Sequence, residues 1–155
     1  GSEYGMTERD MMLRWSLGNE SAADFLAMLS LSYHIADDFV DRDKDPESYS
    51  SKMMAKLMHL AFVDIPANSF YQRYRTELAP VMSASFFIWN ASNTWADGDD
   101  NAKHFSYVYR EIGEQIIITV ARIVGGIDHA AAVTDEIYQT FHAKKTFEGW
   151  KNGES

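Results

Sequence analysis

Apolar residues recur three and four positions apart through most of the chain, the spacing that places side chains on one side of an α-helix. The first long stretch of this kind runs from about 21 to 43, and Ser21 with Asp24 forms a pair typical of a capping box at its start. Its expected end lies just before Pro46, because proline cannot continue a helix. One side of this helix carries Phe25, Met28, Leu29, Ser32, Ala36, Phe39 and Val40.

The rest of the chain repeats the helical spacing. Pro80 should break or kink the helix that contains it, since it lacks a backbone donor. Gly125 and Gly126 follow the longest uninterrupted pattern and are expected to stop it. The expected later helices span about 46–63, 67–95, 100–124 and 128–150. The sequence therefore predicts an all-α fold, a compact bundle of about five to six helices.

The predicted division of the chain is an N-terminal arm or short helix over residues 1–18 and one helical domain over residues 19–155. A length of 155 residues fits a single domain, and 46% hydrophobic with 14% aromatic residues can supply its core. Gly1 and Ser2 are typical of the remnant of a cleaved tag.

Charge and composition exclude several classes of function. With 14 Lys+Arg against 23 Asp+Glu, the net charge is −9, which disfavours nucleic-acid binding because that depends on neutralising phosphates. The absence of cysteine excludes disulfides and thiolate zinc sites, so any metal would be held by oxygen or imidazole ligands. Without a secretory signature or a long apolar run, a cytoplasmic protein without a membrane span is expected.

A polar stripe near the end of the first long helix is the most informative feature. His34, Asp37, Asp38 and Asp41 share one helix face, because spacings of three, four and seven bring side chains together. Like charges at these spacings repel, and a hard cation such as Mg²⁺ would relieve the repulsion. A simple solvated face, opposite the apolar side, is the alternative interpretation.

A second stripe is expected on the predicted 100–124 helix, where His104, Glu111 and Glu114 fall on one side. In an antiparallel bundle, Glu111 and Glu114 could face the aspartates across one site. Surface ion pairs with arginine are the alternative. His34 and His104 are the candidate proton carriers, and the candidate positive groups for binding a diphosphate are Arg122, Lys144 and Lys145.

The segment Asp37-Asp38-Phe39-Val40-Asp41 resembles the DDxxD motif of the isoprenoid synthases. In that all-α family the motif's aspartates bind Mg²⁺, which grips an allylic diphosphate and draws it off as a leaving group. The resemblance implies that Asp37, Asp38 and Asp41 are metal-site residues. For a second metal motif, the chain offers either Glu111 with Glu114 or the set Asn90, Asn93 and Asp97.

The acidic pairs Asp38/Asp41 and Glu111/Glu114 also resemble those of the all-α nucleoside triphosphate pyrophosphatases of the MazG and dimeric dUTPase type. Enzymes of that kind hold Mg²⁺ between acidic pairs on two helices and cleave a diphosphate linkage with a metal-activated water. This resemblance implies the same cofactor and a nucleotide substrate.

The sequence thus predicts Mg²⁺-dependent binding or turnover of a diphosphate-containing small molecule, a prenyl diphosphate or a nucleotide, by a homodimer. The reaction would be that of a diphosphate lyase or transferase, or of a pyrophosphohydrolase. The expected metal residues are Asp37, Asp38, Asp41, Glu111 and Glu114. The alternative is a non-catalytic acidic helical protein whose stripes keep it soluble or bind a basic partner.

Overall fold

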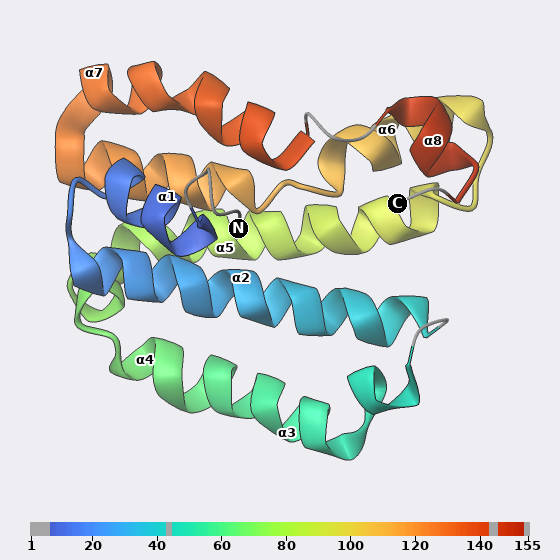
Figure 1. The fold of residues 1–155 in the computed structure, drawn as a ribbon, viewed down its shortest axis with the longest axis horizontal. Helices are drawn as coiled ribbons and strands as arrows, with labels where there is room; N and C mark the ends of the chain where they lie inside the picture. The colour runs from blue at the N-terminus through green and yellow to red at the C-terminus, as the bar shows by residue number, and fades with distance from the viewer. Residues whose placement is uncertain (1–6, 43–44, 143–145, 154–155) are drawn as a thin grey trace. The chain divides into compact units, whose positions relative to one another are not determined.

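A computed structural model describes residues 7–42, 45–142 and 146–153, and every regular element in these residues is a helix (Figure 1). The predicted all-α fold class is therefore confirmed. The elements in order are α1 (Glu8–Trp15), α2 (Glu20–Asp41), η1 (Pro46–Tyr49), α3 (Ser51–His59), η2 (Leu60–Asp64), α4 (Ile65–Ala67), α5 (Ser69–Trp95), α6 (Asp100–Tyr109), α7 (Glu114–His142) and α8 (Phe147–Lys151).

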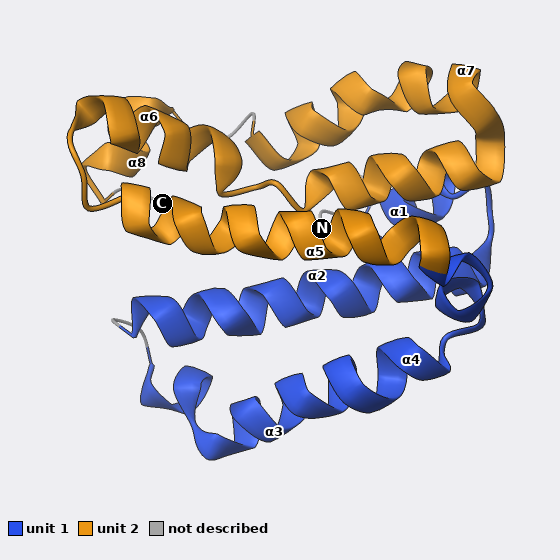
Figure 2. Cartoon of the chain, turned by 180° about the vertical axis from the view of Figure 1, so that it is seen from behind, with its two compact units in different colours: residues 1–75 blue, residues 76–155 orange. Residues whose placement is uncertain are grey.

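The chain divides into two compact units, residues 1–75 and residues 76–155, which Figure 2 shows in blue and orange. The boundary falls inside α5, and each unit is described by itself. The expected bounds of an N-terminal arm and a single domain stay a prediction.

In the first unit, α1 begins at a capping box in which Thr7 and Asp10 each bond the other's backbone N–H. The helix ends in two left-handed residues, Leu17 at φ 52° and Gly18 at φ 78°. The Gly18 N–H donates to the Leu13 carbonyl at 2.8 Å, the long bond typical of a Schellman ending. This tight reversal leads directly into α2.

The start of α2 differs from the expected capping box. Asn19 is the N-cap, while the Ser21 hydroxyl accepts the Phe70 N–H at 2.9 Å. The Asp24 carboxylate lies 2.6 Å from the Arg9 guanidinium of α1. The capping prediction is therefore wrong: both residues are used to join α2 to other segments of the unit.

Helices α1 and α3 both pack on α2. The core of the first unit includes aromatic contacts: the Phe25 ring stacks on Tyr71 at a centroid distance of 5.7 Å. Its buried apolar residues are Met12, Trp15, Ala22, Ala23, Phe25, Leu26, Leu29, Ile35, Leu60, Ile65 and Phe70.

The helix expected from Pro46 to about 63 is divided into three elements. The Ser50 hydroxyl accepts the Met53 N–H and so starts α3 afresh after η1. Next, η2 is a π turn, in which the Ile65 N–H reaches back five residues to the Leu60 carbonyl. The π turn is one residue wider than an α turn.

Helix α5 contains Pro80 and is interrupted, but the break expected at the proline lies elsewhere. The non-helical backbone lies at Tyr74, φ −113° and ψ 21°, six residues before the proline. The proline ring crowds the carbonyl of Thr76, four residues earlier, so it does not by itself account for the break at Tyr74.

The helix expected over 100–124 is also divided, because residues 110–113 form turns between α6 and α7. Gly126, at φ 83° and ψ −175°, is the non-helical residue inside α7. Figure 1 and Figure 2 show α7 turning back on itself, so that its two arms run side by side in opposite directions. The arms bury Ile116, Ile117, Val120, Ala121, Ala130 and Ile137.

The segment Asp100–His142 contains one stretch long and apolar enough to cross a membrane by length and composition alone. The core helix of a globular protein passes the same test. As folded, the reversal at Gly126 leaves each arm of α7 shorter than the roughly 20 residues that a spanning helix needs.

Candidate functional site

The acidic stripe of the first unit lies on the last two turns of α2. Since α2 is a regular helix to Asp41, His34, Asp37 and Asp41 lie on one side of it, with Asp38 beside them. His34, Asp37 and Asp41 are exposed and Asp38 is partly buried. The polar side chains predicted to share one face of a helix therefore do so.

The charge at this helix end is mostly negative. No basic residue lies in the last turn of α2, and Arg42, just beyond it, donates from Nε to the Phe39 carbonyl at 3.0 Å. A helix C-terminus already carries partial negative charge, which favours cations there. The field reaches Tyr33, whose pKa is raised by burial and by the charge of Asp37.

Among the described residues, no group of three or more His, Asp or Glu side chains converges as a ready-made metal cage. Mg²⁺ is commonly bound through one or two protein carboxylates, with water and phosphate oxygens completing the octahedron, so the predicted magnesium site on α2 stays a prediction. The α2 carboxylates do not offer the closed set of ligands typical of structural zinc.

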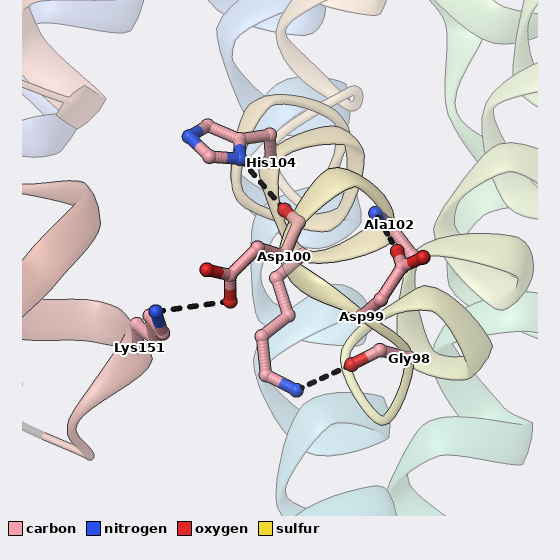
Figure 3. A network of polar contacts seen from close by, with 7 residues as sticks. Gly98, Asp99, Asp100, Ala102, His104 and Lys151 are labelled. Carbon is pink, nitrogen blue, oxygen red and sulfur yellow. Dashed lines mark hydrogen bonds and ion pairs between the residues drawn. The ribbon is translucent and has the colours of Figure 1, made fainter.

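His104, a candidate proton carrier, lies in a packing contact of the second unit. Its Nδ1 is 2.6 Å from the Asp100 carbonyl, and its ring stacks on Phe147 of α8 at a centroid distance of 3.8 Å. Figure 3 shows this residue beside the ion pair of Asp100 with Lys151, at 2.9 Å. These contacts hold α8 against α6.

The same network closes the start of α6. Asp99 accepts the Ala102 N–H at 2.9 Å, and the Lys103 ammonium donates to the Gly98 carbonyl at 2.7 Å (Figure 3). The hydrogen bond and charge of Lys151 lower the pKa of the Asp100 carboxyl. The network stabilises the start of α6 and its contact with α8.

Glu111 and Glu114 do not share a helix face as expected, because Glu111 lies in the turn before α7 and Glu114 begins the helix. Glu114 is 3% exposed, and its Oε1 lies 2.6 Å from Nε2 of His142. Burial, followed by the negative charge of Glu111, raises the pKa of the Glu114 carboxyl to about 9.

Of the three candidate phosphate-binding residues, the structure describes one. The Arg122 guanidinium lies 3.6 Å from the Glu77 carboxylate, with both side chains about half exposed, so it makes a surface ion pair. Lys144 and Lys145 lie outside the described residues. Because the aspartate stripe and the two glutamates belong to different units, their combination into one metal site stays a prediction.

Sequence reasoning missed the contact between Glu114 and His142. Nothing in the spacing of the sequence links two residues so far apart in the chain. The glycine pair at 125–126 signalled that the chain turns there, but the alignment of the two arms depends on tertiary packing.

No protein family model, no curated protein and no solved structure matches this chain.

Proposed function

We propose that this protein binds a diphosphate-containing small molecule through Mg²⁺ held by one or two of the carboxylates of Asp37, Asp38 and Asp41, with water and phosphate oxygens as the other ligands. The observation that carries the proposal is the placement of three carboxylates on the last two turns of α2, where the last turn has no basic residue. The substrate class is a prenyl diphosphate or a nucleotide, as the two family resemblances imply.

Electrostatics supports a cation at this position. The three carboxylates repel one another at i,i+1, i+3 and i+4 spacings, and the helix dipole adds to that repulsion, each effect costing a few tenths of a kcal/mol or more. Arg42 contributes one positive charge against three negative ones. A divalent ion would balance the two remaining negative charges.

The chemistry of the ligands fits Mg²⁺ rather than a soft metal. Carboxylate oxygens are hard donors, and when bound the ion would neutralise diphosphate oxygens and so favour departure of the diphosphate or attack of water on it. His34, which is exposed on the same side of α2, would exchange the proton in this proposal. Glu111 and Glu114 are not part of this proposed metal site.

The test is thermal unfolding of the protein with and without millimolar Mg²⁺ and pyrophosphate, at ionic strength matched with NaCl. At tenfold excess of ligand over Kd, stabilisation is about 1.4 kcal/mol, or roughly 3–6 °C in Tm for a chain of this size. The rise should require Mg²⁺, increase with pyrophosphate, and vanish in the double variant Asp38→Asn, Asp41→Asn.

A control variant, Asp128→Asn with Asp135→Asn, removes two exposed carboxylates of α7 and should retain the full Mg²⁺ response. If both double variants responded equally to Mg²⁺, the stabilisation would come from general screening of an acidic protein, and the proposed site would be wrong. No response in any condition would favour the second candidate, a non-catalytic acidic interaction protein, and Asp38→Asn, Asp41→Asn would then be neutral or slightly stabilising.

A further inference from the structure

The outward side of α3 and of the π turn η2 carries two rows of side chains. Met54, Met58 and Phe62 follow one another four residues apart, so they form an apolar row along the helix. Lys52 and Lys56, also four residues apart, form a basic row further round the same helix, and both lysines are exposed.

The apolar row is open to solvent although the opposite side of the same segment is packed. Phe62 is 74% exposed, Met58 is 51% exposed and Met54 is 39% exposed. Leu60 and Ile65 are buried, and α3, η2 and α4 contact α2, beside which they run (Figure 1). The segment therefore has an inner side that belongs to the core and an outer apolar side that the core does not use, a feature typical of interaction surfaces.

The charge of this part of the chain is opposite to that of the whole protein. Residues 48–75 contain four Lys or Arg side chains and one Asp, a net charge of +3, whereas the whole chain carries −9. The one acidic residue, Asp64, lies 2.9 Å from Nδ1 of His59. A surface that is both apolar and basic is complementary to an anionic partner that also offers an apolar interior.

We propose that the outward side of α3 and η2 binds the surface of an anionic lipid membrane, with Met54, Met58 and Phe62 entering the acyl boundary and Lys52 and Lys56 at the headgroups. Helices that lie in a membrane interface combine apolar side chains on one side with lysines whose long stems reach the headgroups. The outer side of a helix is convex, so it fits a planar interface directly, whereas a protein partner would have to supply a groove. The proposal needs no metal and is independent of the function proposed above.

Sedimentation with lipid vesicles in EDTA tests this surface. One set of vesicles is pure phosphatidylcholine, and the other contains about 30% phosphatidylserine. At about 50 mM NaCl we expect binding to the anionic vesicles and at least tenfold weaker binding to the neutral ones. At about 500 mM NaCl, where the screening length is roughly 4 Å, the difference should disappear. Equal affinity for both vesicles at low salt, or no binding to either, would overturn the proposal.

Two phenylalanines of nearly equal exposure provide a matched pair of variants for the apolar row. Phe62→Ser should weaken binding to the anionic vesicles about tenfold, because it removes the most exposed ring of the surface. Phe87, which is 72% exposed on α5, is the control, and Phe87→Ser should bind like the wild type. Equal losses in the two variants would contradict the proposal, since exposed rings in general would then be responsible.

The basic row has its own pair of variants with matched net charge. Lys52→Gln with Lys56→Gln should weaken binding by roughly fivefold for each lysine removed. Asn101→Glu with Gln139→Glu gives the same net charge by changing two exposed residues outside the segment 48–75, and it should bind within about twofold of the wild type. Equal losses here would mean that only the total charge of the protein matters, and the proposed surface would be wrong.

A fluorescent label distinguishes a membrane from a second copy of the chain. Because the chain has no cysteine, Met58→Cys and Phe87→Cys can each be labelled at one position with an environment-sensitive dye. The emission of the label at 58 should shift to the blue when anionic vesicles are added, and that of the label at 87 should not. A blue shift at 58 that requires only a higher protein concentration, with a dimer in sedimentation velocity that Phe62→Ser abolishes, would assign the surface to a second copy and overturn the proposal.

Discussion

A leucine occupies left-handed backbone where α1 ends. Leu17 has φ 52° and is 58% exposed, so its side chain gains little from burial while its Cβ is crowded by the backbone. The next residue, Gly18, adopts the same region without this cost.

Leu17→Gly should therefore stabilise the protein relative to Leu17→Ala by about 0.5–1 kcal/mol, the relief of left-handed strain less the extra unfolded-state entropy of glycine. Alanine is the matched control, because it loses the same side chain and keeps the strain. Urea unfolding measures the difference, and an alanine variant as stable as the glycine variant would show that the strain is absent.

At this scale, residues within one regular helix could be predicted from sequence and residues joined by tertiary packing could not. The shared face of His34, Asp37 and Asp41 follows from helical spacing alone, and α2 has that spacing. Asp24 was expected to cap its own helix and instead forms an ion pair with Arg9. The local sequence pattern does not show that folding brings an arginine of another helix beside this carboxylate.

Among the elements, the α7 hairpin depends most on a single backbone position. Gly126 lies at φ 83° and ψ −175°, a region that essentially only glycine adopts, and a Cβ built there would meet no atom within 4 Å. Any cost of a side chain at this position is therefore conformational.

Gly126→Ala should destabilise the protein by about 1–3 kcal/mol, the cost of forcing alanine into this region. Gly153→Ala, at a positive φ of 80° near the end of the chain, is the control and should change global stability little. Thermal unfolding with circular dichroism gives both values, and equal effects would mean that the reversal has relaxed to another conformation.

Helix α8 offers a test of ring packing against charge. Phe147 stacks on His104 and meets Tyr107 edge-on at 5.7 Å, and such ring pairs contribute about 0.5–1.5 kcal/mol each. Phe147→Ala should accelerate hydrogen exchange in α8 about tenfold, with the rest of the second unit protected as before. Lys151→Ala should have the smaller effect, since an exposed ion pair contributes little; the reverse order would contradict this assignment.

The stability contributed by the ion pair of Lys151 with Asp100 should depend on pH. Because the pKa of Asp100 is lowered in the folded protein, its contribution is present above the ordinary aspartate pKa and is lost as the pH falls through the lowered value. NMR titration of α8 amides in acid follows this loss, and Lys151→Ala should abolish it.

Element boundaries show why the helical pattern of the sequence was incomplete evidence. The helical spacing of apolar residues continues across residues 110–113, yet the chain forms turns there, so the pattern alone does not show where a helix ends. The prediction of helices was confirmed. Where each helix begins depends on a cap such as Ser50, and the sequence contains several residues that could serve as caps.

For the whole molecule, the net charge of −9 predicts self-repulsion. Raising NaCl from about 20 to 200 mM shortens the screening length from roughly 20 Å to below 10 Å and should raise Tm by a few degrees. Differential scanning calorimetry at pH 7 measures this shift. A fall in Tm would mean that attractive pairs such as Arg9–Asp24 outweigh the repulsion.

The π turn at Leu60–Asp64 has a consequence for insertions and deletions. Within an α-helix, removing one residue rotates everything beyond it by about 100° and carries buried side chains away from the core. Removing one residue from 60–64 would instead convert the wide turn to an ordinary α turn and keep the register of both flanks. Homologues of this chain should therefore vary in length by a single residue at this position more readily than anywhere else in the segment 51–64.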